Sequence, residues 1–130
     1  MTNTPQRAEW WKKFLCEKCQ FPATEKLRAQ FLIAELSEFC DCGCNSFKVQ
    51  IPSSHCVVPI AERGCYRKVF EANFQLVEEG KTLEVILFVG EDGNLAYVEI
   101  DCCGNSSPVP DAISVIEPPF HVHASSTLVP

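Results

Sequence analysis

Apolar positions follow two different periods along the chain, helical near the N-terminus and strand-like beyond about residue 32. In the first region they recur at spacings of three and four, which is the period of one helix face. They are Trp10, Trp11, Phe14, Leu15 and Cys19. Thr4 followed by Pro5 is typical of a helix start, because threonine caps free backbone N–H groups and proline loses nothing at the first helical position. The pattern predicts a helix over residues 5–19.

A second short helix is predicted directly after the first. Pro22 disfavours helical geometry at Phe21, so the first helix should end near that residue. Leu27 and Phe31 then lie one helical turn apart on a common face. We therefore expect the second helix over residues 23–31.

A β-hairpin is expected around the sequence CDCGC, residues 40–44. Residues 47–51, FKVQI, alternate between apolar and polar, which is the pattern of a half-buried strand. Residues 33–39 fit either a helix continuation or a strand, and the neighbouring strand favours the second reading. The prediction is a hairpin of residues 33–39 and 46–51 joined through CDCGC.

Three further runs predict an antiparallel meander over residues 69–101. Residues 70–76 alternate strictly, residues 83–89 are nearly all apolar and should form a central strand, and residues 95–101 form the third strand. The sequences EEGKT and GEDGN between them are turns.

The predicted fold is α+β, with two N-terminal helices packed on one face of an antiparallel sheet of about five strands. Residues 1–130 fit a single domain, helical over 1–31 and built of sheet over 33–101. Pro108, Pro110, Pro118 and Pro119 follow Cys103 and argue against a long regular element. Residues 102–130 are therefore expected to be an irregular C-terminal segment.

Composition adds that the chain is globular and of ordinary polarity. Hydrophobic residues make up 46% and charged residues 22% of the chain, which excludes wholesale disorder. There is no apolar run of about 18 residues, and the N-terminus lacks the apolar core of a signal peptide. A cytoplasmic protein that does not bind membranes is expected.

Charge is distributed unevenly. The net charge is −6, yet residues 70–130 contain one basic residue, Lys81, and ten acidic ones. An ordinary surface mixes both signs. A strongly acidic half repels phosphate backbones and attracts a basic surface, so the charge predicts a basic protein partner and no nucleic acid.

Nine cysteines raise the possibility of metal or redox chemistry. Cys16 and Cys19 form a CxxC pair, and two of Cys40, Cys42 and Cys44 could complete a tetrahedral zinc site. Redox catalysis is disfavoured, since the CxxC pair ends a helix instead of beginning one. The favoured interpretation of CDCGC is a tight turn with packed thiols, so no cofactor is expected and structural zinc stays an alternative.

Catalytic candidates are few. The sequence offers His55-Cys56 and the pair His121 and His123, but no supporting constellation such as GxSxG or a glycine-rich phosphate loop. Packed or solvated histidines are the simpler interpretation. We therefore expect that the protein is not an enzyme.

Four segments carry a resemblance to a known group of proteins. In order they are LRAQF, CDCGCNSFKVQI, LEVILFVGEDGNLAYVEID and SSPVPD, within residues 27–111. This arrangement resembles small bacterial proteins with a C-x-C-G-C hairpin, which are similar to immunity proteins of contact-dependent growth inhibition and other polymorphic toxin systems. The resemblance implies a protein that binds and neutralises a cognate toxin.

Charge agrees with that implication, because nuclease toxins hold phosphates in basic clefts that an acidic inhibitor can cover. The alternative is a zinc-stabilised interaction module that uses the CxxC and CxCxC cysteines. The predicted partner-binding residues are Glu78, Glu79, Glu84, Glu91, Asp92, Tyr97, Glu99 and Asp101.

Overall fold

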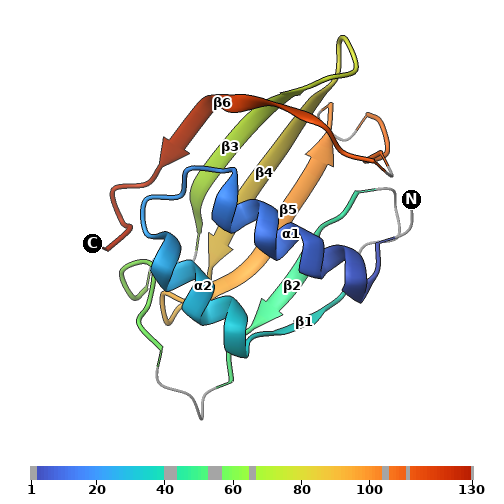
Figure 1. Ribbon diagram of the computed structural model, residues 1–130. Helices are drawn as coiled ribbons and strands as arrows, with labels where there is room; N and C mark the ends of the chain where they lie inside the picture. The colour runs from blue at the N-terminus through green and yellow to red at the C-terminus, as the bar shows by residue number, and fades with distance from the viewer. Residues whose placement is uncertain are drawn as a thin grey trace.

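The computed structural model describes residues 3–39, 44–52, 57–64, 67–103, 106–110 and 112–129. Two N-terminal helices lie across one side of a single antiparallel sheet, so the fold is α+β (Figure 1). The elements are α1 (Pro5–Glu17), α2 (Thr24–Ile33), β1 (Glu35–Ser37), β2 (Phe47–Gln50), β3 (Lys68–Leu76), β4 (Thr82–Val89), β5 (Leu95–Cys102) and β6 (Val115–Ala124). Neither helix is long and apolar enough to cross a membrane.

The start of α1 is the predicted one. Thr4 Oγ1 accepts a hydrogen bond from the backbone N–H of Arg7 at 3.1 Å, and Pro5 occupies the first turn. The helix ends at Glu17, two residues earlier than predicted, and Gln20 then takes a left-handed φ of 62° that no helix continues through.

The sheet contains six strands in the order β1-β2-β5-β4-β3-β6. The predicted hairpin is β1 with β2, where Leu36 lies opposite Val49, and the predicted meander is β3, β4 and β5 in adjacent positions. The structure corrects two expectations, since the strands number six instead of about five, and residues 102–130 are not wholly irregular.

The missed strand is β6, which pairs with β3 at the edge of the sheet. Pro118 and Pro119 lie inside it, and proline cannot donate to a strand ladder. An edge strand tolerates this because one of its sides has no partner strand, and the register of β6 against β3 shifts near these prolines. The prediction that these prolines exclude a long regular element was therefore wrong, because β6 is 10 residues long and contains two of them.

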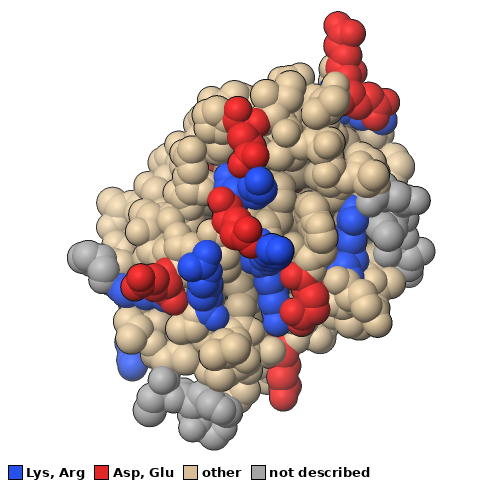
Figure 2. All heavy atoms as spheres, viewed as in Figure 1, with Lys and Arg blue, Asp and Glu red and all other residues tan. Residues whose placement is uncertain are grey.

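Charges of both signs cover the helix side of the molecule. Figure 2 shows Lys and Arg interleaved with Asp and Glu on this side. Lys12 pairs with Glu9 at 2.9 Å, and Lys18 pairs with Glu117 at 3.1 Å. No single-sign field forms on the part of this side that the structure describes.

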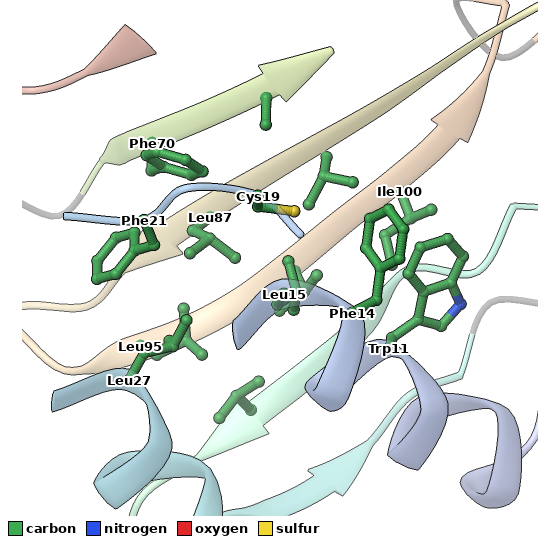
Figure 3. Close-up of a cluster of buried hydrophobic side chains, with 14 of the residues drawn as sticks. Trp11, Phe14, Leu15, Cys19, Phe21, Leu27, Phe70, Leu87, Leu95 and Ile100 are labelled. Atoms are coloured by element: carbon green, nitrogen blue, oxygen red, sulfur yellow. The ribbon is translucent and has the colours of Figure 1, made fainter. Parts of the chain in front are cut away.

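The hydrophobic core lies between the helices and the near face of the sheet. Trp11, Phe14 and Leu15 of α1 and Leu27 of α2 point down onto strand residues that include Leu87, as Figure 3 shows. Phe14 meets Phe74 edge-on, with ring centroids 5.2 Å apart. Each such buried side chain stabilises the fold by about 1.5–3 kcal/mol through apolar transfer.

Two buried polar side chains fix the connections around this core. Asn45 Oδ1 accepts hydrogen bonds from Trp11 Nε1 and Arg7 Nε, both at 2.9 Å, and Arg7 also donates to the Pro110 carbonyl at 2.7 Å. These bonds hold α1 against the start of β2. Asn45, which follows the sequence CDCGC, therefore has a structural role that its sequence context did not reveal.

Gln30 of α2 makes the second connection. Its Oε1 accepts from the backbone N–H of Leu95 at 2.8 Å, and its Nε2 donates to the Val58 carbonyl and to Asn94 Oδ1, both at 3.0 Å. The side chain is fully buried, and both its amide oxygen and its amide nitrogen make hydrogen bonds. It joins α2 to the beginning of β5.

Gly93 is closely packed in the β4–β5 turn. Its carbonyl accepts from the N–H groups of Ile60 and Ala61 at 3.0 and 3.1 Å, its φ is 80°, and a Cβ atom there would collide with the Ala61 carbonyl oxygen. Gly80 has the same φ and nothing within 4 Å of its would-be Cβ. We expect Gly93→Ala to lower the free energy of unfolding by about 3 kcal/mol or more, and Gly80→Ala by about 1–2 kcal/mol.

Urea unfolding of the two variants beside the wild type measures both values. Equal losses would mean that the backbone conformation alone matters and that the docking of Ile60 and Ala61 on this turn is not tight.

Candidate functional site: the solvent face of the sheet

The two faces of the sheet differ because only one is covered by helices. Along β4, residues Leu83, Val85 and Leu87 are buried against the core, and the positions between them point to the opposite face. On that opposite face Glu84 lies across from Asp101 of β5. We call it the solvent face.

A carboxylate cluster occupies the middle of the solvent face. It consists of Glu71 on β3, Glu84 on β4, and Glu99 and Asp101 on β5. Glu84, Glu99 and Asp101 each place an oxygen atom within 4.8 Å of the others. No other such group of three acidic, histidine or cysteine side chains occurs in the described ranges. These oxygens are close enough to share one cationic group.

Mutual repulsion and partial burial shift the acidities of the cluster. Partial burial, a hydrogen bond with Glu71 and the charges of Asp101, Glu71 and Glu99 raise the pKa of Glu84 to about 7. Burial and the charge of Asp101 also raise the pKa of Glu99, and Lys68 offsets part of that shift. Partial burial and mutual repulsion therefore disfavour the fully ionised form of the cluster.

The carboxyl group of Asp101 is in an unfavourable environment. Burial raises the pKa of its carboxyl group, which disfavours the charged form. Its Oδ1 atom is buried and receives no hydrogen bond from the described part of the chain. An incoming donor or cation would satisfy this atom.

Histidines from β6 border the cluster. His121 lies opposite Asn73 and His123 opposite Glu71, so both are on the solvent face. The Nε2 atom of His121 is 3.7 Å from Glu71 Oε2, an ion pair only when the histidine is protonated. The two histidines therefore lie beside acids, and no catalytic thiol is next to them in the described residues.

Aromatic side chains lie on the other flank of the cluster. Phe88 faces Tyr97 across β4 and β5, with ring centroids 6.0 Å apart. Together with Arg67 and Glu99 they line a shallow pocket of about 260 Å³. The solvent face thus combines negative charge with a partly exposed aromatic surface.

The eight predicted partner-binding residues fall into three places. Glu84, Glu99 and Asp101 are in the cluster, and Tyr97 is beside it on the same face. Glu78 and Glu79 lie in the β3–β4 turn, where Glu78 pairs with Lys81 at 3.4 Å, while Glu91 and Asp92 lie in the β4–β5 turn. The eight residues of β4 separate these two turns by roughly 26 Å.

Sequence reasoning missed Glu71 and the two histidines. Glu71 is one of the outward positions of an alternating run, so the signal for its face was present. Its neighbours depend on the strand order, because β3 meets β4 on one side and β6 on the other. The position of the histidines could not be found without recognising β6.

The predicted zinc ligands do not assemble in the described part of the chain. Cys19 is buried in the core, and burial raises the pKa of its thiol, which favours the neutral form. Burial also raises the pKa of Cys16, and Cys44 is buried at the entry to β2. Cys40 and Cys42, like the His55-Cys56 candidate, lie outside the described residues. The zinc hypothesis therefore stays a prediction.

Comparison of the chain with family models, with curated proteins and with solved structures finds no match.

The raised pKa of Glu84 predicts a specific pH dependence of stability. The folded protein holds this proton more tightly than the unfolded chain, so ionisation of Glu84 destabilises the fold. The effect is absent below the ordinary pKa of 4.5 and complete above about pH 7. We expect Glu84→Gln to melt at a higher temperature than the wild type at about pH 8, and at the same temperature at pH 4.5.

Thermal unfolding at both pH values tests this expectation. Glu79→Gln in the exposed β3–β4 turn is the control, and its difference from the wild type should not change between the two pH values. A pH-independent difference for Glu84→Gln would refute the mutual repulsion within the cluster.

Proposed function

We propose that this protein is an immunity protein that binds and neutralises a cognate toxin by covering its basic substrate cleft with the solvent face of the sheet. The supporting observation is the carboxylate cluster. Within the described ranges, no Lys or Arg forms an ion pair with any of its four acids. Lys68 and, when protonated, His121 offset part of this charge, and the rest is available to an external cation.

The electrostatics of the cluster favour a cationic partner over water. Bringing an arginine or lysine between Glu84, Glu99 and Asp101 would relieve their repulsion and satisfy the buried Asp101 Oδ1. Complementary charge also steers the encounter, so association should be fast and should slow with added salt.

On this proposal, the aromatic side chains beside the cluster supply binding energy that charge alone does not. Desolvated aromatic side chains commonly carry the largest share of binding energy at an interface, while exposed ion pairs contribute little. Phe88 and Tyr97 lie directly beside Glu99 on this face. On this proposal they anchor the partner, and the cluster selects and orients it.

The size of the face suits a protein partner. The six strands contain 42 residues, which at a rise of about 3.3 Å per residue and a strand spacing of about 4.8 Å present roughly 670 Å². This is close to the area of about 800 Å² that each partner contributes to a specific interface. A small ligand would need a more enclosed site.

The toxin class follows from charge and from the resemblance of the CDCGC hairpin proteins to immunity proteins. A nuclease must hold phosphates, so its active-site cleft is basic. A protein that fills such a cleft excludes the nucleic acid and needs no chemistry of its own. The proposed role accordingly requires neither catalysis nor a cofactor.

Reversing the charge of the cluster tests the proposal. We expect Glu99→Lys/Asp101→Lys to abolish protection of cells that express a cognate toxin domain. Affinity for that domain should weaken by about 100-fold or more, because the new lysines repel a basic cleft. Cell survival and binding by calorimetry measure the two effects.

The control is Glu9→Lys/Glu17→Lys, which makes the same change of charge on the helix side. This variant should protect cells as the wild type does. Equal loss in both variants would show that net charge is sufficient, and equal protection would remove the solvent face from the binding site.

A further inference from the structure

Two adjacent cysteines follow Asp101 of the carboxylate cluster, Cys102 as the last residue of β5 and Cys103 just beyond it. The Sγ atoms of Cys102 and Cys103 are 3.7 Å apart. Cys102 is fully buried across from Leu83, whereas Cys103 is only partly buried. The Cys103 thiol is thus accessible to reagents, whereas the Cys102 thiol is enclosed in the core beside it.

The backbone holds the pair in this arrangement. Cys103 has a left-handed φ of 54°, which residues other than glycine rarely adopt. Its N–H donates to the Thr82 carbonyl at 2.9 Å, and its own carbonyl accepts from the Ser106 N–H at 3.2 Å and from Ser106 Oγ at 2.6 Å. These bonds keep the Cys103 side chain beside the neighbouring strand.

The two thiols differ in acidity. A hydrogen bond from the Thr82 backbone, with further contributions from Cys102, Ser107 and Lys81, lowers the pKa of Cys103. Burial, followed by interaction with Cys103, raises the pKa of Cys102. Cys103 is therefore the nucleophile of the pair and Cys102 remains protonated beside it.

We propose that Cys102 and Cys103 form a reversible thiol-oxidation site that reacts with small-molecule disulfides such as glutathione disulfide. The Cys103 thiolate attacks one sulfur of the disulfide, the S–S bond breaks, and one glutathione thiolate leaves. The Cys102 thiol loses its proton and attacks Cys103 Sγ, which releases the second glutathione. Two protein thiols are oxidised to a disulfide, and one disulfide is reduced to two thiols.

The reaction is reversible because the product is strained. Consecutive Cα atoms are about 3.8 Å apart, whereas disulfide-linked Cα atoms are usually about 4.4–6.8 Å apart. Strained disulfides are more easily reduced than relaxed ones. A bond between neighbours therefore suits a site that is oxidised and reduced repeatedly, and not a structural crosslink.

The CxxC pair of the same chain provides an internal comparison. Cys19 is buried in the core, and burial raises the pKa of both Cys16 and Cys19. Neither is a reactive thiolate, although this spacing is the one associated with redox motifs. The geometry favours the adjacent cysteines instead.

Peptide mass spectrometry of the full-length protein tests the proposal. Lys81 is the last basic residue, so trypsin releases residues 82–130 as one peptide in which Cys102 and Cys103 are the two cysteines. The reduced protein is treated with glutathione disulfide, quenched with acid, alkylated with iodoacetamide under denaturing conditions and digested. We expect this peptide to lose two hydrogens, to take up no alkyl group and to retain no glutathione.

Two variants separate the steps. Cys102→Ser should accumulate one glutathione on Cys103, because the resolving thiol is absent. Cys103→Ser should form neither product on this peptide. Circular dichroism verifies that each variant is folded, which is needed because Cys102 is fully buried and Cys103 packs against the core.

Several results would overturn the proposal. They are two alkylated cysteines in the treated wild-type peptide, a glutathione retained on either of them, or a disulfide that reduced glutathione does not reopen. The experiment needs no toxin, so its outcome is independent of the proposed immunity function.

Discussion

Two short helices can cover only one face of the six-stranded sheet, and the rest of the structure follows from this constraint. The apolar side chains of α1 and α2 pack on the inward positions of the strands, with Trp11 and Leu27 fully buried. The outward positions must then be compatible with water. Because facing residues on adjacent strands lie about 5 Å apart, acids at outward positions such as Glu84 and Asp101 are forced close together.

The contacts that stabilise the fold lie on the covered face of the sheet, and the carboxylate cluster of the proposed function lies on the solvent face. The buried hydrogen bonds of Asn45 Oδ1 and of the Gln30 amide join helices to strands and loops on the core side. Unfavourable features are also found outside the core, in the like charges around Glu84 and in the left-handed backbone of Cys103. Local conflicts of this kind are expected where a protein retains residues for a purpose other than folding.

The cluster and the dithiol are also neighbours. Asp101 belongs to the cluster and Cys102 follows it, and Thr82 and Lys81, which influence Cys103, precede Glu84 on the next strand. The strand alternation nevertheless directs Cys102 into the core while Asp101 points outward. The two proposed sites therefore share strand ends but not surfaces.

Much of the fold was readable from local pattern, because each element depended on contacts within itself or with a neighbour in sequence. The start of α1, the hairpin of β1 and β2 and the meander of β3, β4 and β5 were all predicted. The faces of single strands were readable too, which is why Tyr97 was placed with Glu99 and Asp101.

Tertiary structure alone decided which of these faces meet. The strand order brings Glu71 to Glu84 and His121 to Glu71, although these residues are far apart in the chain. It also gives the prolines of β6 an edge position. Such contacts depend on non-local backbone hydrogen bonds, and no periodicity within one segment can encode the identity of its partner strand.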